Sequence, residues 1–323
     1  MDGALILPVQ FTYLVFNHLI RKTMGLRYSI LLFKKTFRNL YFLMFFNGFI
    51  LASLFYFKME SSYENGLFAT IKSSIDSKID SNDTPDSILV KSMNVCYQLM
   101  NSRASTFVNN NTTDLGLEST LFHSTTFDLM TTQGACGSYS QVLARIIGTY
   151  NYPVRIAQMK AGGIYGAHNI VEAYNGSYWV VLDPTFNLYF IRPDSRLASF
   201  ADVQHNWPYY AKQVPEGYNF LYHYEDVRYA NWTKIPILFP AIKGVLNLTM
   251  GTDRANTLCI RTFFLNTYST YFYVILLLYI PIFLMTFRRV IKTKIFPSQD
   301  IPVTFRNIIK YIRPRIIGTS YIH

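Results

Sequence analysis

Two long apolar runs constrain the fold of this chain more than any other feature. They occupy residues 40–57 and 268–287, which are 18 and 20 residues long and contain no charged side chain. About 20 helical residues cross the hydrocarbon core of a bilayer. The sequence therefore predicts two transmembrane helices. Pro281, inside the second run, is compatible with a helix in a membrane because neighbouring groups satisfy the carbonyl that proline leaves unpaired.

The distribution of charge predicts the orientation of these helices. Residues 1–39 carry six basic and one acidic side chain, and residues 288–323 carry eight and one, whereas residues 58–267 carry sixteen and seventeen. Basic flanks stay in the cytoplasm. Both termini are therefore predicted to be cytoplasmic and residues 58–267 extracytoplasmic, and the composition favours a bacterial inner (plasma) membrane. Because the net charge of +11 lies on the tails, a nucleic-acid partner is not expected.

These features divide the chain into six predicted segments. They are a basic N-terminal segment (1–39), a first transmembrane helix (40–57), a polar linker (58–85), an extracytoplasmic domain with an aromatic-rich extension (86–267), a second transmembrane helix (268–287) and a basic tail (288–323). A weaker apolar run at residues 4–20 is either an interfacial helix or a third span. A transporter or channel is disfavoured because the apolar runs carry no charge.

Cys136 is predicted to be the first residue of a buried amphipathic helix. Apolar side chains follow it at helical spacing, namely Tyr139, Val142, Leu143, Ile146, Ile147 and Tyr150. A helix N-terminus stabilises a thiolate through its free N–H groups and its dipole. The sequence thus places a potential nucleophile where its pKa is lowered.

A predicted β-hairpin brings a histidine and an aspartate together. Residues 154–160, 168–174 and 178–182 have strand composition, and Asn175-Gly176 is a strong signal for a two-residue turn. That turn would place His168 directly opposite Asp183 on one face of the sheet. Cys136 would then act as nucleophile, His168 as general base and acid, and Asp183 as the group that orients the imidazole. Gln133 is the candidate side-chain donor to the oxyanion.

Each of these residues also has an ordinary structural explanation. A cysteine at a helix start is often inert, and an aspartate before proline commonly opens a turn.

No two histidines have His-x-x-x-His spacing and no phosphate-binding loop is present, so neither a metal nor a cofactor is expected. The aromatic residues at 188–231 either line a substrate cleft, cover the sheet or lie on the lipid headgroup layer. Cys96 and Cys259 are a candidate disulfide.

Three sequence blocks resemble the transglutaminase-like superfamily. They are GACGSYS at 134–140, HNIVEAY at 168–174 and YWVVLDPTFN at 178–187, and the resemblance covers about residues 85–190. It implies an α+β fold with a papain-like core, in which a helix bearing the cysteine packs on an antiparallel sheet bearing the histidine and aspartate. The family's triad falls on Cys136, His168 and Asp183.

The resemblance implies thiol acyl chemistry on amides without fixing the reaction, because the family includes cross-linking enzymes, peptidases, amidases and inactive proteins. We therefore expect a membrane-anchored thiol enzyme that hydrolyses an amide or transfers its acyl group. Its expected partners are a peptide, protein or cell-envelope substrate and membrane lipid. The alternative is a catalytically silent binding or assembly module. The sequence leaves the oligomeric state open.

Overall fold

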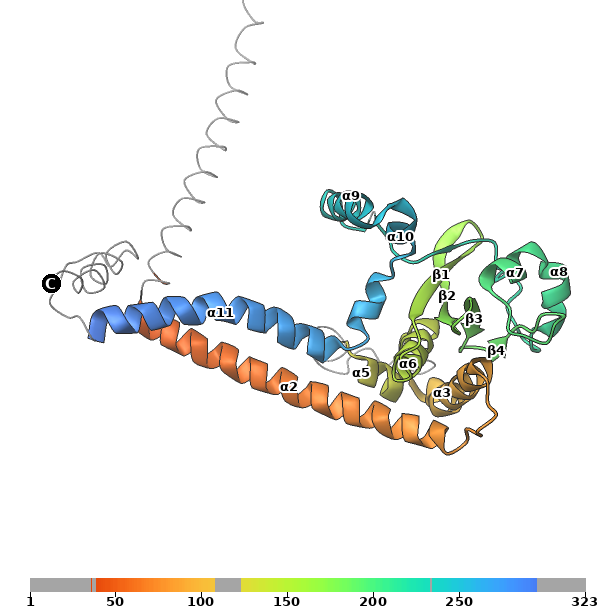
Figure 1. Ribbon diagram of the computed structural model, residues 1–323, viewed down its shortest axis with the longest axis horizontal. Helices are drawn as coiled ribbons and strands as arrows, with labels where there is room; N and C mark the ends of the chain where they lie inside the picture. The colour runs from red at the N-terminus through yellow and green to blue at the C-terminus, as the bar shows by residue number, and fades with distance from the viewer. Residues whose placement is uncertain (1–35, 37–38, 108–122, 233, 295–323) are drawn as a thin grey trace, which may run out of the picture. The chain divides into compact units, whose positions relative to one another are not determined.

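The computed structural model describes residues 36, 39–107, 123–232 and 234–294, and Figure 1 shows their arrangement. The apolar run at residues 4–20 and most of the two basic tails lie outside the described residues. The chain divides into two compact units, one formed by 53–275 and the other by 1–52 together with 276–323. The fold of the described chain is α+β, as predicted.

An antiparallel sheet forms the centre of the larger unit. Its strand order is β4-β3-β2-β1-β5. The strands are β1 (Val154–Ala161), β2 (Ile164–Tyr174), β3 (Trp179–Asp183), β4 (Leu188–Tyr189) and β5 (Val227–Arg228). The three predicted strands correspond to β1, β2 and β3. Both faces of β2 are buried from His168 to Ala173, so this strand lies between two packed layers.

Helices cover one face of the sheet. They are α3 (Pro85–Phe107), α5 (Thr125–Thr131) and α6 (Cys136–Gly148), and Figure 1 shows them grouped beside the strands. The predicted apolar stripe of α6 packs here, with Val142, Leu143 and Ile147 fully buried. Each such side chain contributes about 1.5–3 kcal/mol through burial. This packing fixes the position of Cys136 at the start of α6.

Aromatic side chains cover the opposite face of the sheet. They come from α7 (Phe200–His205), from α8 (Trp207–Tyr210) and from the loop that follows the short 3₁₀ helix η1 (Ala211–Gln213). Tyr210, Tyr218 and Tyr224 are buried against sheet residues such as Met159 and Ile170. Of the interpretations of this aromatic segment, packing on the sheet is the one that describes Tyr210, Tyr218 and Tyr224.

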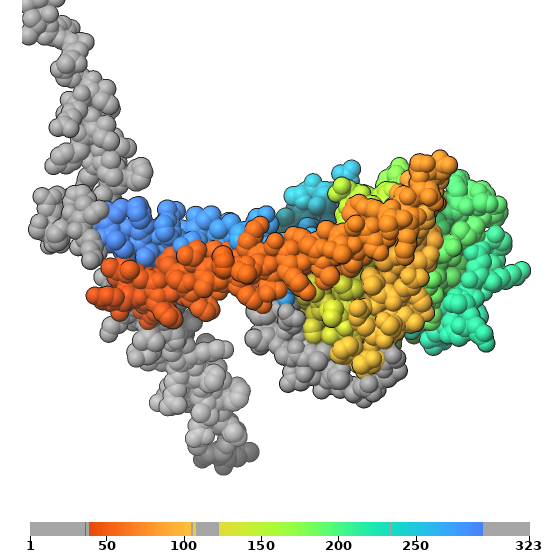
Figure 2. Space-filling model, turned by 90° about the horizontal axis from the view of Figure 1, so that it is seen from below, coloured from red at the N-terminus to blue at the C-terminus, as the bar shows by residue number. Residues whose placement is uncertain are grey.

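The first long helix, α2 (Leu40–Asp76), continues far beyond the predicted first span. The prediction of a linker over residues 58–85 is therefore wrong for 58–76, which is helical (Figure 1 and Figure 2). Buried positions recur at alternating steps of four and three residues, at Leu54, Phe57, Ser61, Glu64, Phe68, Ile71 and Ile75. Apart from Ser61, the Ser, Asp and Asn residues of this segment that suggested a linker lie on the exposed face of the helix. Phe68, Ile71 and Ile75 on its buried face belong to the domain core.

The second long helix is α11 (Thr267–Lys294), with Pro281 inside it. Within the described residues, α2 and α11 are the two helices long and apolar enough to cross a membrane. In the smaller unit, the amide of Asn47 donates a 2.7 Å hydrogen bond to the Thr286 hydroxyl. The segment before α11 contains α9 (Leu238–Met250), α10 (Thr252–Thr257) and the 3₁₀ helix η2 (Ile260–Phe264).

The proposed disulfide between Cys96 and Cys259 is not formed, because both thiols are free. Each is buried and bonded to a separate backbone group. The Cys96 thiol donates to the Tyr139 carbonyl at 3.8 Å, and the Cys259 sulfur lies 3.4 Å from both the carbonyl and the N–H of Ile156. Burial raises the pKa of the Cys96 thiol, as expected for an inert core cysteine.

Candidate active site

The hairpin between β2 and β3 differs from the predicted one by its turn. Tyr174 pairs with Trp179, and residues 175–178 form a four-residue loop. The Asn175 carboxamide oxygen accepts hydrogen bonds from the backbone N–H groups of Ser177 and Tyr178, both at 3.0 Å, and so closes this loop. The predicted register is therefore wrong by two residues, and continuing the observed register places Asp183 opposite Ile170.

A shift of two residues keeps side chains on the same face of a sheet, because the side-chain period is two. His168 and Asp183 are consequently diagonal neighbours, with 2.7 Å between His168 Nε2 and Asp183 Oδ2. Each is 1% exposed. The second Asp183 oxygen accepts the N–H of Thr185 at 3.1 Å. The aspartate therefore holds the imidazole through a buried hydrogen bond.

The His168 ring is also fixed by aromatic contacts. Tyr222 stacks on it with ring centres 4.4 Å apart and an angle of 7° between planes, and Phe186 packs at 5.7 Å. Burial alone would lower the pKa of His168, but the negative charge and hydrogen bond of Asp183 outweigh it and raise the pKa to about 9. The protonated imidazole is therefore favoured at neutral pH.

Cys136 occupies the first turn of α6, as predicted, and is half-buried. Burial acts to raise the pKa of its thiol. The hydrogen bond and charge of His168, followed by hydrogen bonds from Asn169, reverse this effect and bring the pKa below its usual value of 9.0. Because His168 Nε2 is bonded to Asp183, Nδ1 is left for the sulfur. The three predicted residues therefore lie together.

The strand geometry explains how neighbouring residues of β2 both contact this thiol. His168 and Asn169 point to opposite faces of the sheet. In the described sheet, pairing of β2 with β3 ends at Val171, and the pairing of β2 with β1 changes register immediately beyond His168. Irregular strand ends of this type commonly lie next to active sites. The N-terminus of α6 meets β2 at this point, where Ser140 Oγ donates to the Asn169 carbonyl at 3.0 Å.

A polar cluster holds the turn that precedes Cys136. Ser138 Oγ donates to Asp128 and accepts the Gly134 N–H at 2.9 Å. The Asp128 carboxylate is buried and lies 2.8 Å from His123 Nε2. This turn contains Ala135 at φ 45° and ψ −122°, a conformation that a non-glycine residue adopts only when its surroundings impose it. The cluster thus fixes the approach of the chain to Cys136.

Two further residues complete the site and were not predicted. Asn169 Nδ2 lies 3.5 Å from Cys136 Sγ, and its Oδ1 accepts a 2.9 Å hydrogen bond from Arg261. Asn169 follows His168 directly in the sequence, which was a usable signal. Arg261 had no such signal, since it lies in η2 outside the three blocks. Gln133 lies in the turn between α5 and α6, where its N–H donates to Thr131 Oγ1 at 3.3 Å. Its role as oxyanion donor stays a prediction.

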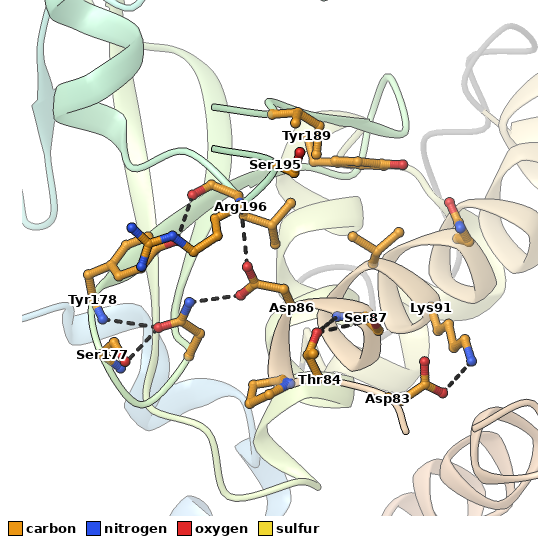
Figure 3. Close-up of a pocket in the computed structure, with 16 residues that line it drawn as sticks. Asp83, Thr84, Asp86, Ser87, Lys91, Ser177, Tyr178, Tyr189, Ser195 and Arg196 are labelled. Carbon is orange, nitrogen blue, oxygen red and sulfur yellow. Dashed lines mark hydrogen bonds and ion pairs between the residues drawn. The ribbon is translucent and has the colours of Figure 1, made fainter. Parts of the chain in front are cut away.

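A separate pocket of about 700 Å³ lies at the N-terminus of α3 (Figure 3). None of Cys136, His168 and Asp183 lines it. The Asp86 carboxylate bridges two of its walls by accepting the Asn175 amide at 2.7 Å and the Leu197 N–H at 3.2 Å. These bonds attach α3 to the β2–β3 loop, so this pocket has a structural explanation and does not contain the chemistry of the thiol.

Within the described part of the chain, no group of three or more His, Cys, Asp or Glu residues is placed to hold a metal ion. The arrangement instead combines a half-exposed thiol, a buried imidazole–carboxylate pair and an amide donor on one α+β scaffold. Comparison of the sequence with protein-family models and curated proteins, and of the structure with solved structures, finds no match.

Proposed function

We propose that this protein is a thiol acyl-transfer enzyme of the transglutaminase-like type, in which Cys136, His168 and Asp183 form the catalytic triad. The observation that carries the proposal is the buried 2.7 Å pair of His168 and Asp183 beside a half-exposed thiol of lowered pKa. An inert structural cysteine has the opposite properties, as the buried Cys96 does. The preferred reaction is hydrolysis or transfer of an amide acyl group on a peptide, protein or cell-envelope substrate.

The proposed reaction has two halves. The Cys136 thiolate attacks the amide carbonyl carbon, and the Cys136 backbone N–H and the Asn169 amide, which lies 3.5 Å from the sulfur, would stabilise the oxyanion. The proton on His168 passes to the leaving amine as the carbon–nitrogen bond breaks, which leaves a thioester on Cys136. His168, now neutral, takes a proton from water or from an acceptor amine, whose attack releases the acyl group and restores the Cys136 thiolate and the protonated His168.

An activated ester tests for turnover without knowledge of the natural substrate. The full chain in detergent is mixed with p-nitrophenyl acetate, and nitrophenol release is followed together with the mass of Cys136. We expect a burst, an acetylated Cys136, and steady release that ethanolamine accelerates. The Cys136→Ala variant should show none of these. Acetylation of Cys136 without later release would instead indicate the silent binding module.

We also propose that α2 and α11 anchor the domain in a bacterial inner membrane, with the domain on the extracytoplasmic side and both termini in the cytoplasm. The support is the apolar length of both helices and the basic residues that flank them. In a Cys136→Ala background, a cysteine placed at exposed Glu216 should react with a membrane-impermeant maleimide in spheroplasts. A cysteine at Lys292 should react only after lysis. The reverse pattern would refute this orientation.

A further inference from the structure

A row of polar side chains runs across three strands toward the candidate nucleophile. Gln158 on β1 pairs in register with Asn169 on β2 and with Arg228 on β5. Residues paired directly across a sheet project from the same face. Arg228 Nε donates to the Gln158 amide oxygen at 2.9 Å, and Asn169 Nδ2 lies 3.5 Å from Cys136 Sγ. Arg228, Gln158 and Asn169 therefore form a continuous row that ends at the thiol.

A second arginine joins this row from the segment that precedes α11. Arg261 donates to Asn169 Oδ1 at 2.9 Å, so a single carboxamide separates its guanidinium from the sulfur. The charge of Arg261 interacts with both Cys136 and Arg228. Both arginines are half-buried. Arg261 thus lies one carboxamide from the thiol and interacts with the like charge of Arg228 at the other end of the row, although their mutual repulsion opposes this arrangement.

Within the described part of the chain, neither guanidinium forms an ion pair with a carboxylate. Arg228 bonds the Gln158 amide and the Tyr165 carbonyl, and Arg261 bonds the Asn169 amide. Asp226, two residues before Arg228, bonds the Tyr165 hydroxyl instead. On the same sheet the protein does pair a half-buried arginine with an acid, since Arg155 Nε lies 2.9 Å from Glu172 Oε2. In the described chain, no carboxylate therefore pairs with either of these two guanidinium groups.

We propose that Arg261 and Arg228 form an anion subsite, so that the acyl donor carries a carboxylate or another anionic group close to its scissile carbonyl. This inference rests on the proposed function and narrows its substrate class. A guanidinium presents planar, paired donors that match an oxyanion, and a half-buried one loses less of its attraction to salt than an exposed one. A neutral or cationic acyl donor would leave the two charges unpaired on binding.

Two alkylating reagents of nearly equal size test this subsite directly. Iodoacetate and iodoacetamide both react by attack of the Cys136 sulfur on the methylene carbon with loss of iodide, and only iodoacetate carries a negative charge. The ratio of their rate constants, divided by the same ratio for glutathione at the same pH and ionic strength, measures the local preference for an anion. The full chain in a non-ionic detergent is used, and the Cys136→Ala variant gives the background.

We expect wild type to favour iodoacetate over the glutathione reference, and added salt to weaken this preference. Arg261→Gln and Arg228→Gln should each lower the ratio by about 3- to 10-fold, the effect of one partly screened charge. Glutamine at position 261 retains a donor for Asn169, and Arg261→Lys should keep most of the ratio, which separates loss of charge from loss of structure. Arg254→Gln, an exposed position in α10, is the matched control and should leave the ratio unchanged.

The inference is overturned if wild type matches glutathione, or if neither glutamine variant lowers the ratio. Failure of the proposed function gives a different result. If the proposed function is wrong, Cys136 would react with iodoacetamide only at the pH at which an ordinary thiol ionises. The ratio can still be measured there, because every thiol ionises at sufficiently high pH.

Discussion

His168 and Asp183 are bonded across 2.7 Å, although they are two positions away from direct register on β2 and β3. The diagonal arrangement places the carboxylate on Nε2 of the ring and leaves Nδ1 for the thiol. Tyr222 closes one face of the ring. The orientation of the imidazole is therefore determined by the loop at 175–178, which sets the register, and by the aromatic layer on that face of the sheet.

Asp183→Asn tests the carboxylate. Asparagine retains an oxygen for the Thr185 N–H but loses the charge that favours the imidazolium. We expect the rate of acetylation of Cys136 by p-nitrophenyl acetate to fall by about 10²- to 10⁴-fold, the usual contribution of a positioned acid–base group. Asp194→Asn, which alters an exposed ion pair with Arg196, should have no effect. A rate near wild type for Asp183→Asn would mean that this pair serves structure alone.

Asn169 and Gln133 are compared as donors to the oxyanion. Because Asn169 Nδ2 already lies 3.5 Å from the sulfur, we expect Asn169→Ala to lower the acetylation rate by about 10²- to 10³-fold. Gln133→Ala should lower the acetylation rate by less than Asn169→Ala does. Burst kinetics on both variants, with circular dichroism to confirm folding, give the comparison. Equal rates for wild type and Asn169→Ala would remove Asn169 from the oxyanion hole.

Gly134→Ala tests the turn before the nucleophile. An added Cβ would lie 2.7 Å from Ser138 Oγ, the hydroxyl that links the Gly134 N–H to Asp128. Relieving this overlap should cost about 1–3 kcal/mol in the free energy of unfolding and slow acetylation by displacing Cys136. Gly148→Ala, at the end of α6, where an added Cβ has nothing within 4 Å, is the control. Similar melting temperatures and rates for both variants would contradict the proposed role of the turn.

Phe68→Ala tests whether the extension of α2 belongs to the domain core. Phe68 is 1% exposed, and truncation of a buried phenylalanine typically costs about 3–5 kcal/mol. Tyr63→Ala removes a ring that is 63% exposed on the same helix and should change stability by less than about 0.5 kcal/mol. Thermal unfolding of the full chain in detergent measures both. Equal stabilities would support the polar linker that the composition suggested.

Local patterns predicted the elements that carry the site. The apolar stripe after Cys136 and the strand composition around His168 depend on neighbours a few residues apart, so α6, β1, β2 and β3 could be predicted from sequence. The hairpin register could not, because an Asn-Gly pair fits both a two-residue turn and the four-residue loop that Asn175 closes. The two-residue shift left both side chains on the same face of the sheet, and this is why the His168–Asp183 pair was still predicted correctly.

Contacts between distant segments were beyond prediction. Arg261 reaches Asn169 across 92 residues of sequence, and no periodicity or spacing relates them. The helical extension over 58–76 was missed for a different reason. Its exposed face is rich in Ser, Asp and Asn, and this composition concealed the alternating four- and three-residue spacing of its buried positions, such as Phe68, Ile71 and Ile75.

The pH dependence of Cys136 alkylation tests the central claim most directly. Iodoacetamide rates are measured from about pH 5 to about pH 10 on wild type and His168→Ala, with Cys136→Ala as background. Because His168 lowers the pKa of Cys136, wild type should react well below the usual thiol value of 9.0, and His168→Ala should shift the profile to higher pH. Above about pH 9, the pKa of His168, the imidazole loses its proton and no longer forms an ion pair with the Cys136 thiolate. A wild-type profile that rises only near 9.0 and coincides with that of His168→Ala would contradict the account.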